Sequence, residues 1–143
     1  TLRDLLRVQP RGVKVVWMDH PMAFHKESRT AALAARSVMA QKGAAAFFTF
    51  IDLVFANQRH VTPENLATWA RTAGADPEKM KADVAAETYK AGLEADVTQS
   101  GQLGVRGTPH LFLNGATAGH AEGFWKIRAQ LQPLLGKALR PVK

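Results

Sequence analysis

A long helical block with strands on both sides is the feature that most constrains the fold of this chain. Residues 28–102 show helical spacing of apolar residues, interrupted only by signals that start or end a helix. The β-branched run 12–19 precedes the block, and two short strand-like segments, 110–114 and 116–119, follow it. This order favours an α/β or α+β domain with a large helical insertion.

Four helices are predicted inside the block from signals at their ends. Ser28 is expected to cap a helix that closes at Gly43, and a second helix follows at once, from 44 to about 58. Thr62 and Asp76, each followed by proline, are expected to cap the third and fourth helices. The fourth pattern is predicted to continue through the apolar positions Val84, Leu93 and Val97.

Helical spacing also recurs at both ends of the chain, in 1–11 and in 121–135. The first stretch has no capping residue and barely two turns, so the chain is expected to begin in the middle of an element. Asn114 and Gly115 lie between the two strand-like segments, and Asn-Gly in that position predicts a tight hairpin.

Composition indicates a single globular domain of 143 residues without a nucleic-acid role. The net charge is +7, but the basic residues are distributed singly among apolar positions rather than gathered in a stripe with aromatic residues. No uninterrupted apolar run approaches the roughly 18 residues typical of a membrane span, and the first residues lack the apolar centre of a signal peptide. We therefore expect neither nucleic acid nor a membrane span among its features.

The 143 residues contain no cysteine, so disulfides, thiolate catalysis and Cys-based metal sites are excluded within them. The histidines lie on separate elements without metal-ligand spacing, and no metal site is expected. The serines have no nearby Asp/His pattern in the sequence, which argues against a hydrolase. The residues weighed in this way are His20, His25, His60, His110, His120, Ser28, Ser37 and Ser100.

Three motifs together resemble the DsbA-like branch of the thioredoxin superfamily. They are HPMAFH after the first strand, DLVFANQ at the end of a helix, and GVRGTPHLFLNG before the hairpin, and they occur in the family's order over nearly the whole chain. The resemblance implies one DsbA-like thioredoxin domain over 1–143, of α/β class. Its helical insertion would be 28–102, and its thioredoxin core 1–27 plus 103–143.

The same resemblance places two elements before the first residue given. Residues 13–18 would form the second core strand, while the first core strand and the family's Cys-x-x-Cys are expected upstream of Thr1. Without that first strand, 13–18 and 110–114 would stand two strand spacings apart, about 9–10 Å, with unpaired edges. We expect an N-terminal segment or another chain to fill this place in the sheet.

The function implied by the resemblance is thiol–disulfide oxidoreduction on protein or peptide thiols in the periplasm or another extracytoplasmic compartment, with a redox partner protein and no cofactor. The implied substrate-binding residues are Arg106, Gly107, Thr108 and Pro109, and Pro109 takes the family's cis-proline position. The chain itself is expected to be inert in that exchange, because it has no thiol.

Two other readings stay open at this point. One is a redox-inactive thioredoxin-fold module that binds extended peptides, and the other is a relative of kappa-type glutathione transferases or chromene-carboxylate isomerases. Whether the chain is part of an enzyme is therefore undecided by sequence. The turn before the strand would by itself explain the residue types from Gly107 to Pro109.

Overall fold

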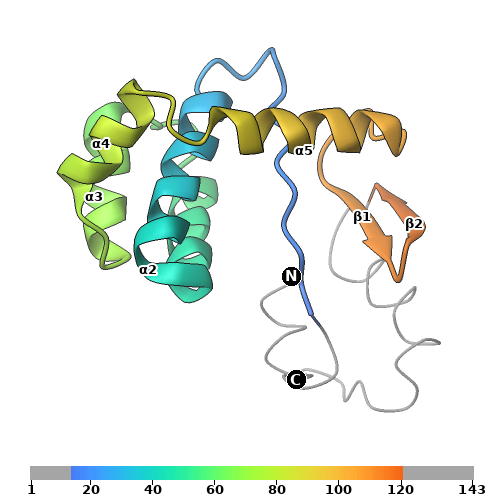
Figure 1. The fold of residues 1–143 in the computed structure, drawn as a ribbon, viewed down its shortest axis with the longest axis horizontal. Coiled ribbons are helices and arrows are strands. Elements are labelled where there is room, and N and C mark those ends of the chain that lie inside the picture. Colours follow the sequence, from blue (N-terminus) through green and yellow to red (C-terminus); the bar gives the residue numbers. More distant parts are fainter. Residues whose placement is uncertain (1–13, 121–143) are drawn as a thin grey trace. The chain divides into compact units, whose positions relative to one another are not determined.

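The computed structural model of the protein describes residues 14–120 (Figure 1). The helices predicted over 1–11 and 121–135 lie outside these residues. In chain order the described elements are four helices followed by a two-stranded hairpin. Their contacts divide the described residues into a helical unit, Asp19–Gln102, and a hairpin unit, formed by 14–18 and 103–120.

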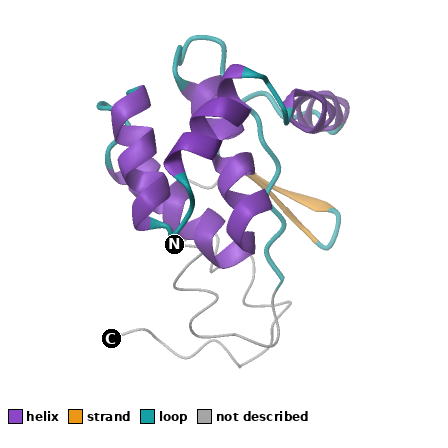
Figure 2. Ribbon diagram, turned by 60° about the vertical axis from the view of Figure 1, so that its left-hand side comes forward, coloured by secondary structure: helices purple, strands orange, loops and turns teal. Residues whose placement is uncertain are grey.

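The helical unit consists of helices and their connections, with no strand among its residues (Figure 2). It contains the whole segment 28–102 that the sequence predicted as a helical block. Its helices are α2 (Ser28–Ala56), α3 (Pro63–Thr72), α4 (Pro77–Ala85) and α5 (Lys90–Gln102).

Helix α2 is two helical segments joined at Gly43, as the sequence predicted. Gly43 has φ 78° and ψ −172°, values that no helical residue adopts. A residue with a Cβ pays for a positive φ, and glycine does not. The break therefore arises from the local sequence at Gly43.

Helices α3 and α4 begin at the predicted capping residues. The Thr62 hydroxyl accepts the backbone N–H of Asn65 at 3.2 Å. The Asp76 carboxylate accepts the N–H groups of Glu78 at 2.9 Å and Lys79 at 3.3 Å. These bonds satisfy N–H groups that have no partner within their own helix, which explains why both helices start where they do.

The prediction that Ser28 caps the first helix was wrong. The N-cap residue is Glu27, and Ser28 is already helical. Its hydroxyl points back to the preceding loop, where it donates to the carbonyl oxygens of Met22 at 3.2 Å and His25 at 2.7 Å. The side chain thus fastens the loop rather than the helix end.

The single helix predicted after Asp76 is interrupted between α4 and α5. Glu87 has a φ of 49°, in the left-handed region, and it ends the helical path after Ala85. The Thr88 N–H then donates to the carbonyl of Asp83 at 2.9 Å, which closes a turn before α5 starts at Lys90. Apolar spacing alone did not reveal this turn.

The strand predicted over 13–18 is not observed in the described part of that segment, and this prediction was wrong. Residues 14–18 have no strand assignment, and the sheet among the described residues contains only β1 and β2. A strand is stable only when its backbone groups bond to a neighbour. Residues 14–18 belong to neither strand of the described sheet.

The hairpin follows the sequence prediction closely. Strands β1 (His110–Leu113) and β2 (Ala116–His120) are antiparallel, with Leu113 opposite Ala116. Asn114 and Gly115 have φ values of 50° and 85°. A turn with two positive φ values matches the twist of the strands that it joins, which is why Asn-Gly is favoured there.

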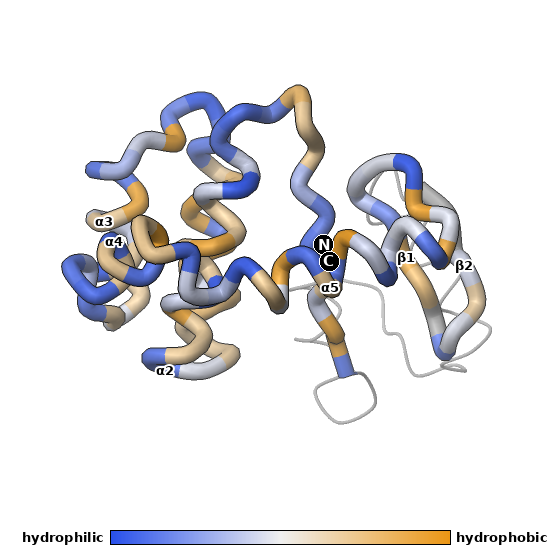
Figure 3. The backbone as a smooth tube through the Cα atoms, turned by 45° about the horizontal axis from the view of Figure 1, so that its top comes forward, coloured by the Kyte–Doolittle hydropathy of each residue, from blue (hydrophilic) through white to orange (hydrophobic). Residues whose placement is uncertain are grey.

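The core of the helical unit is apolar and draws on all four helices. Hydrophobic positions recur at intervals along the helices, as the tube coloured by hydropathy shows (Figure 3). Helix α2 packs on both α3 and α4, and these two pack on each other. The most deeply buried large side chains are Val38, Phe50, Leu66, Met80 and Leu93.

Helix α2 is the one helix among the described residues that is long and apolar enough to cross a membrane by length and composition. Its 29 residues are divided at Gly43, however, and neither part approaches the roughly 20 residues that a span requires. Its buried residues contact the other helices of the same unit.

Candidate functional site

The loop before β1 carries the residues that the resemblance assigned to substrate binding. It follows α5 through Gly104, whose φ is 79°, and Val105, whose side chain is buried. Arg106, Thr108 and Pro109 are exposed, and Gly107 is half-buried. The peptide bond between Thr108 and Pro109 is cis, and β1 begins at the next residue.

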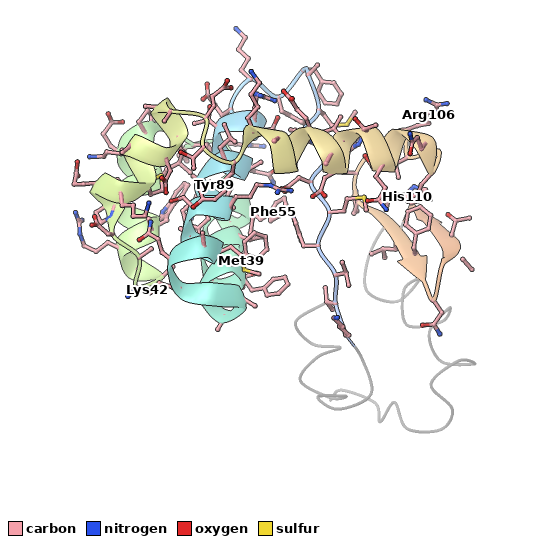
Figure 4. All side chains as sticks on the ribbon, viewed as in Figure 1. Met39, Lys42, Phe55, Tyr89, Arg106 and His110 are labelled. Carbon is pink, nitrogen blue, oxygen red and sulfur yellow. The ribbon has the colours of Figure 1, made fainter. Side chains whose placement is uncertain are left out.

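The site loop, Arg106–Pro109, offers backbone groups to a partner. No backbone hydrogen bond joins Arg106, Gly107 or Thr108 to another residue in the described part of the chain. Strand β1 pairs with β2 on one side, and no second neighbour is described on the other. The Arg106 side chain points away from the hairpin (Figure 4). The N–H and C=O groups of Arg106, Gly107 and Thr108 therefore have no backbone partner among the described residues.

These 143 residues cannot perform thiol exchange by themselves, because a thiolate is the nucleophile in that reaction. The chain contains no cysteine, and the described residues contain no group of three or more His, Cys, Asp or Glu that could hold a metal ion. His110 follows Pro109 directly, and its Nε2 lies 2.9 Å from the hydroxyl oxygen of Thr117 on β2. That contact fixes the ring across the hairpin.

A second polar cluster lies in the helical unit, and the sequence analysis missed it. The Nδ1 atom of His20 lies 2.6 Å from the hydroxyl oxygen of Ser100, although these residues are 80 positions apart. The sequence offered no Asp/His pattern for Ser100, and the structure brings His20 alone to its hydroxyl. The Ser100 hydroxyl also donates to the carbonyl of Val97 at 2.9 Å, and the residue is 1% exposed.

These contacts make Ser100 a structural residue rather than a nucleophile. The Ser100 hydroxyl is engaged on both sides, by Nδ1 of His20 and by the carbonyl oxygen of Val97. Burial denies a substrate access to the oxygen. One signal in the sequence could have pointed to the cluster: Gly92, Asp96 and Ser100 are spaced by four and share a helix face.

His25, which the HPMAFH motif suggested as a residue that docks its loop on the helical block, has an exposed side chain, with its ring 4.5 Å from that of Phe24. Its backbone carbonyl, not its imidazole, holds the start of α2 through Ser28.

Comparison with known families matches residues 7–132 to a family model described as Thioredoxin. The chain belongs to the thioredoxin family. The helices and small sheet of this chain are consistent with the thioredoxin fold. Membership of the family suggests a redox-related function. The site loop lies inside the matched residues.

One curated relative of this thioredoxin-family chain is the Na(+)/H(+) antiporter NhaA 3 of Salinispora tropica. The two are 30% identical over 115 residues, which is 80% of this chain and 17% of that protein. The chain thus spans less than a fifth of the relative that it matches. No solved structure matches the chain.

Proposed function

We propose that this chain is the substrate-binding part of a DsbA-type thiol–disulfide oxidoreductase that acts on protein or peptide thiols. The observation that carries the proposal is the site loop of a thioredoxin-family chain: it is exposed, and its backbone groups have no partner among the described residues. An extended peptide can pair with such groups by main-chain hydrogen bonds. The helical insertion of the DsbA type belongs to the same proposal.

The exchange itself requires a dithiol, which we place before Thr1 in the parent protein. A substrate thiolate would attack one sulfur of the oxidised pair, form a mixed disulfide and release the other sulfur of the pair as a thiolate. A second substrate thiolate would then displace the pair, so the substrate would end as a disulfide and the pair as a reduced dithiol. The role of the site loop is to hold the substrate backbone while these bonds change.

An extracytoplasmic compartment, such as a bacterial periplasm, suits this proposal because disulfides persist in oxidising surroundings. A redox partner protein would return the dithiol to its starting state. The antiporter relative, in which the matched segment makes up 17% of the protein, supports the further idea that such a domain is used as one segment of a longer protein.

A second candidate function is peptide binding without redox chemistry. The absence of cysteine from all 143 residues favours it. In this case the site loop and the start of β1 would hold a peptide, and no sulfur chemistry would follow. The two candidates share the binding surface and differ in the dithiol.

Two measurements separate them. The first follows amide chemical shifts of the 143-residue chain as an unstructured, cysteine-free peptide is added, and we expect changes confined to the site loop and β1. The second assays insulin disulfide reduction by the chain and by its natural N-terminally extended form. Turnover by the extended form alone supports the oxidoreductase; peptide shifts without turnover by either support the binding module. Absence of peptide shifts would overturn both.

A further inference from the structure

Two residues on one face of α5, Asp96 and Ser100, contact the segment with which the helical unit begins. Gly92, Asp96 and Ser100 lie on successive turns of one helix face. The backbone N–H of Asp19 donates to the Asp96 carboxylate at 3.0 Å, and His20 contacts Ser100 as described above. The first two residues of the unit therefore lie along its last helix.

Arg36, on α2, joins both partners of this contact. Its Nε donates to the Asp19 carboxylate at 2.7 Å, and its Nη2 donates to the same Asp96 oxygen that accepts the Asp19 N–H. Asp19 is thus held through its side chain by α2 and through its backbone by α5. We call Asp19, Arg36 and Asp96 the clasp.

The clasp is better shielded from water than the other ion pairs between the same helices. The side chains of Arg36, Asp19 and Asp96 are 23%, 7% and 25% exposed. Arg29 lies two turns earlier on α2 and pairs with Glu87 and Glu94, but these three side chains are 41–54% exposed. Exposed pairs contribute little because water and salt screen them, whereas removing one partner of a shielded pair is costly.

The clasp also lies where the two ends of the helical unit come together. The unit begins at Asp19, and Ser100 lies two residues before its end at Gln102. The most extensive contacts between helices of this unit, by contrast, are those of α2 with α3 and α4 and of α3 with α4. The clasp and the core of α3 and α4 are therefore separate sets of contacts, which can open independently.

We propose that the clasp is a local fastening that closes the helical unit on itself, and that opening it releases residues 19–27 from α5 while α3 and α4 stay folded. The released segment carries Phe24, whose side chain is 73% exposed. A short segment fixed at one end by Ser28 and at the other by the clasp gains chain entropy when the clasp opens. The device is thus a latch on this segment.

Amide hydrogen exchange of the full chain tests the latch at one atom, the Asp19 N–H, with Arg36→Met as the variant. We expect the Asp19 amide to exchange at least tenfold faster, while core amides of α3 and α4 change less than twofold. Neither Asp19 nor its neighbours are altered, so the intrinsic exchange rate is unchanged. Arg29→Met is the matched control, since it removes an arginine from the same helix, and it should leave the Asp19 amide protected.

Asp96→Asn provides a second variant that retains the shape of the side chain and an oxygen to accept the Asp19 N–H. It should accelerate the Asp19 amide by a smaller factor than Arg36→Met, again without effect on α3 and α4. Unchanged exchange at Asp19 in both variants would overturn the proposal. Equal acceleration at Asp19, α3 and α4 would overturn it too, since that is the signature of global unfolding.

Discussion

Gly92 of α5 lies directly beneath the guanidinium of Arg36 from α2. A Cβ placed on Gly92 would stand 2.5 Å from Nη1 of Arg36 and 3.6 Å from its Cζ. Real Cβ atoms do not approach a neighbour at 2.5 Å, so the guanidinium would have to shift if residue 92 carried a side chain. The absence of a methyl group on one helix thus permits an ion pair on another.

Gly92→Ala should therefore destabilise the protein, although alanine is the better helix former. The helix gains up to about 1 kcal/mol. Displacement of the guanidinium from the buried Asp19 carboxylate costs more than the helix gains. Complete removal of one partner from a buried ion pair costs about 3–5 kcal/mol. Since Arg36 is 23% exposed and can move, we expect a net loss of about 1–2 kcal/mol in urea unfolding.

The same substitution in an Arg36→Met background is the control for this prediction. Without the guanidinium, Gly92→Ala should change sign and stabilise the helix by up to about 1 kcal/mol. An identical effect in both backgrounds would show that the close approach to Arg36 has no energetic weight.

Two glycines have open space around them, and their replacement by alanine should change the free energy of unfolding in opposite directions. Gly43→Ala should lower the free energy of unfolding by about 1–2 kcal/mol, because its φ of 78° strains any residue with a Cβ. Gly101→Ala, within α5 and without a positive φ, should raise it by up to about 1 kcal/mol. Thermal melts of the two variants measure the difference, and a common sign would contradict the backbone explanation.

Gln41 fastens the junction between α3 and α4 to α2. Its amide oxygen accepts the Asp76 N–H at 2.8 Å, and its amide nitrogen donates to the Asp76 carbonyl at 3.3 Å. Gln41→Ala should lower the free energy of unfolding by about 1–2 kcal/mol, since both bonds are lost. Gln99→Ala, at an exposed position of α5, should stay within about 0.5 kcal/mol of wild type. Equal effects in chemical denaturation would rule out this role.

Acid should weaken the contact between α2 and α4 through Asp83. The Ser37 hydroxyl donates to this buried carboxylate at 2.6 Å, and Lys79 adds a further bond at 3.1 Å. The Ser37 hydrogen bond first, and Lys79 after it, hold the pKa of Asp83 below its usual value of 3.8. When folding lowers the pKa of a carboxyl group, the resulting stability is fully present at pH values above the pKa of the unfolded state. It is lost as the pH falls through the pKa of the folded state.

Ser37→Ala should thus cost stability at neutral pH, by about 1–3 kcal/mol, and less in acid. It removes the largest cause of the lowered pKa, so the difference in unfolding free energy between wild type and variant should shrink below about pH 4. Urea titrations at neutral pH and near pH 3 measure this difference. A constant difference would show that the hydroxyl does not act through the Asp83 charge.

Sequence patterns predicted those elements whose ends are decided locally. Gly43, Thr62 and Asp76 fix helix boundaries through one dihedral angle or one side-chain bond, and the structure shows each of them in that role. Asn114 and Gly115 fix the hairpin in the same way. Ser28 shows the limit of this reasoning: the residue type suits a cap, but two nearby carbonyls compete for its hydroxyl.

The candidate site was predictable only in part. The site loop was named from its motif, and the structure adds that it is exposed and that its backbone has no partner among the described residues. The run 14–18 was expected to be a strand, and its β-branched composition gave no sign that it would lie outside the described sheet. The β-propensity of a sequence describes one segment alone, whereas a strand forms only when a second segment pairs with it.

The sequence by itself determined the break at Gly43, the starts of α3 and α4 and the hairpin turn, because capping bonds and positive φ angles involve residues a few positions apart. Only the tertiary structure decided which polar side chains meet. Asp19 and Asp96 are 77 positions apart, and His20 and Ser100 are 80 apart. Such pairs depend on the packing of α2 against α5 and on the space left at Gly92, and no local pattern contains that information.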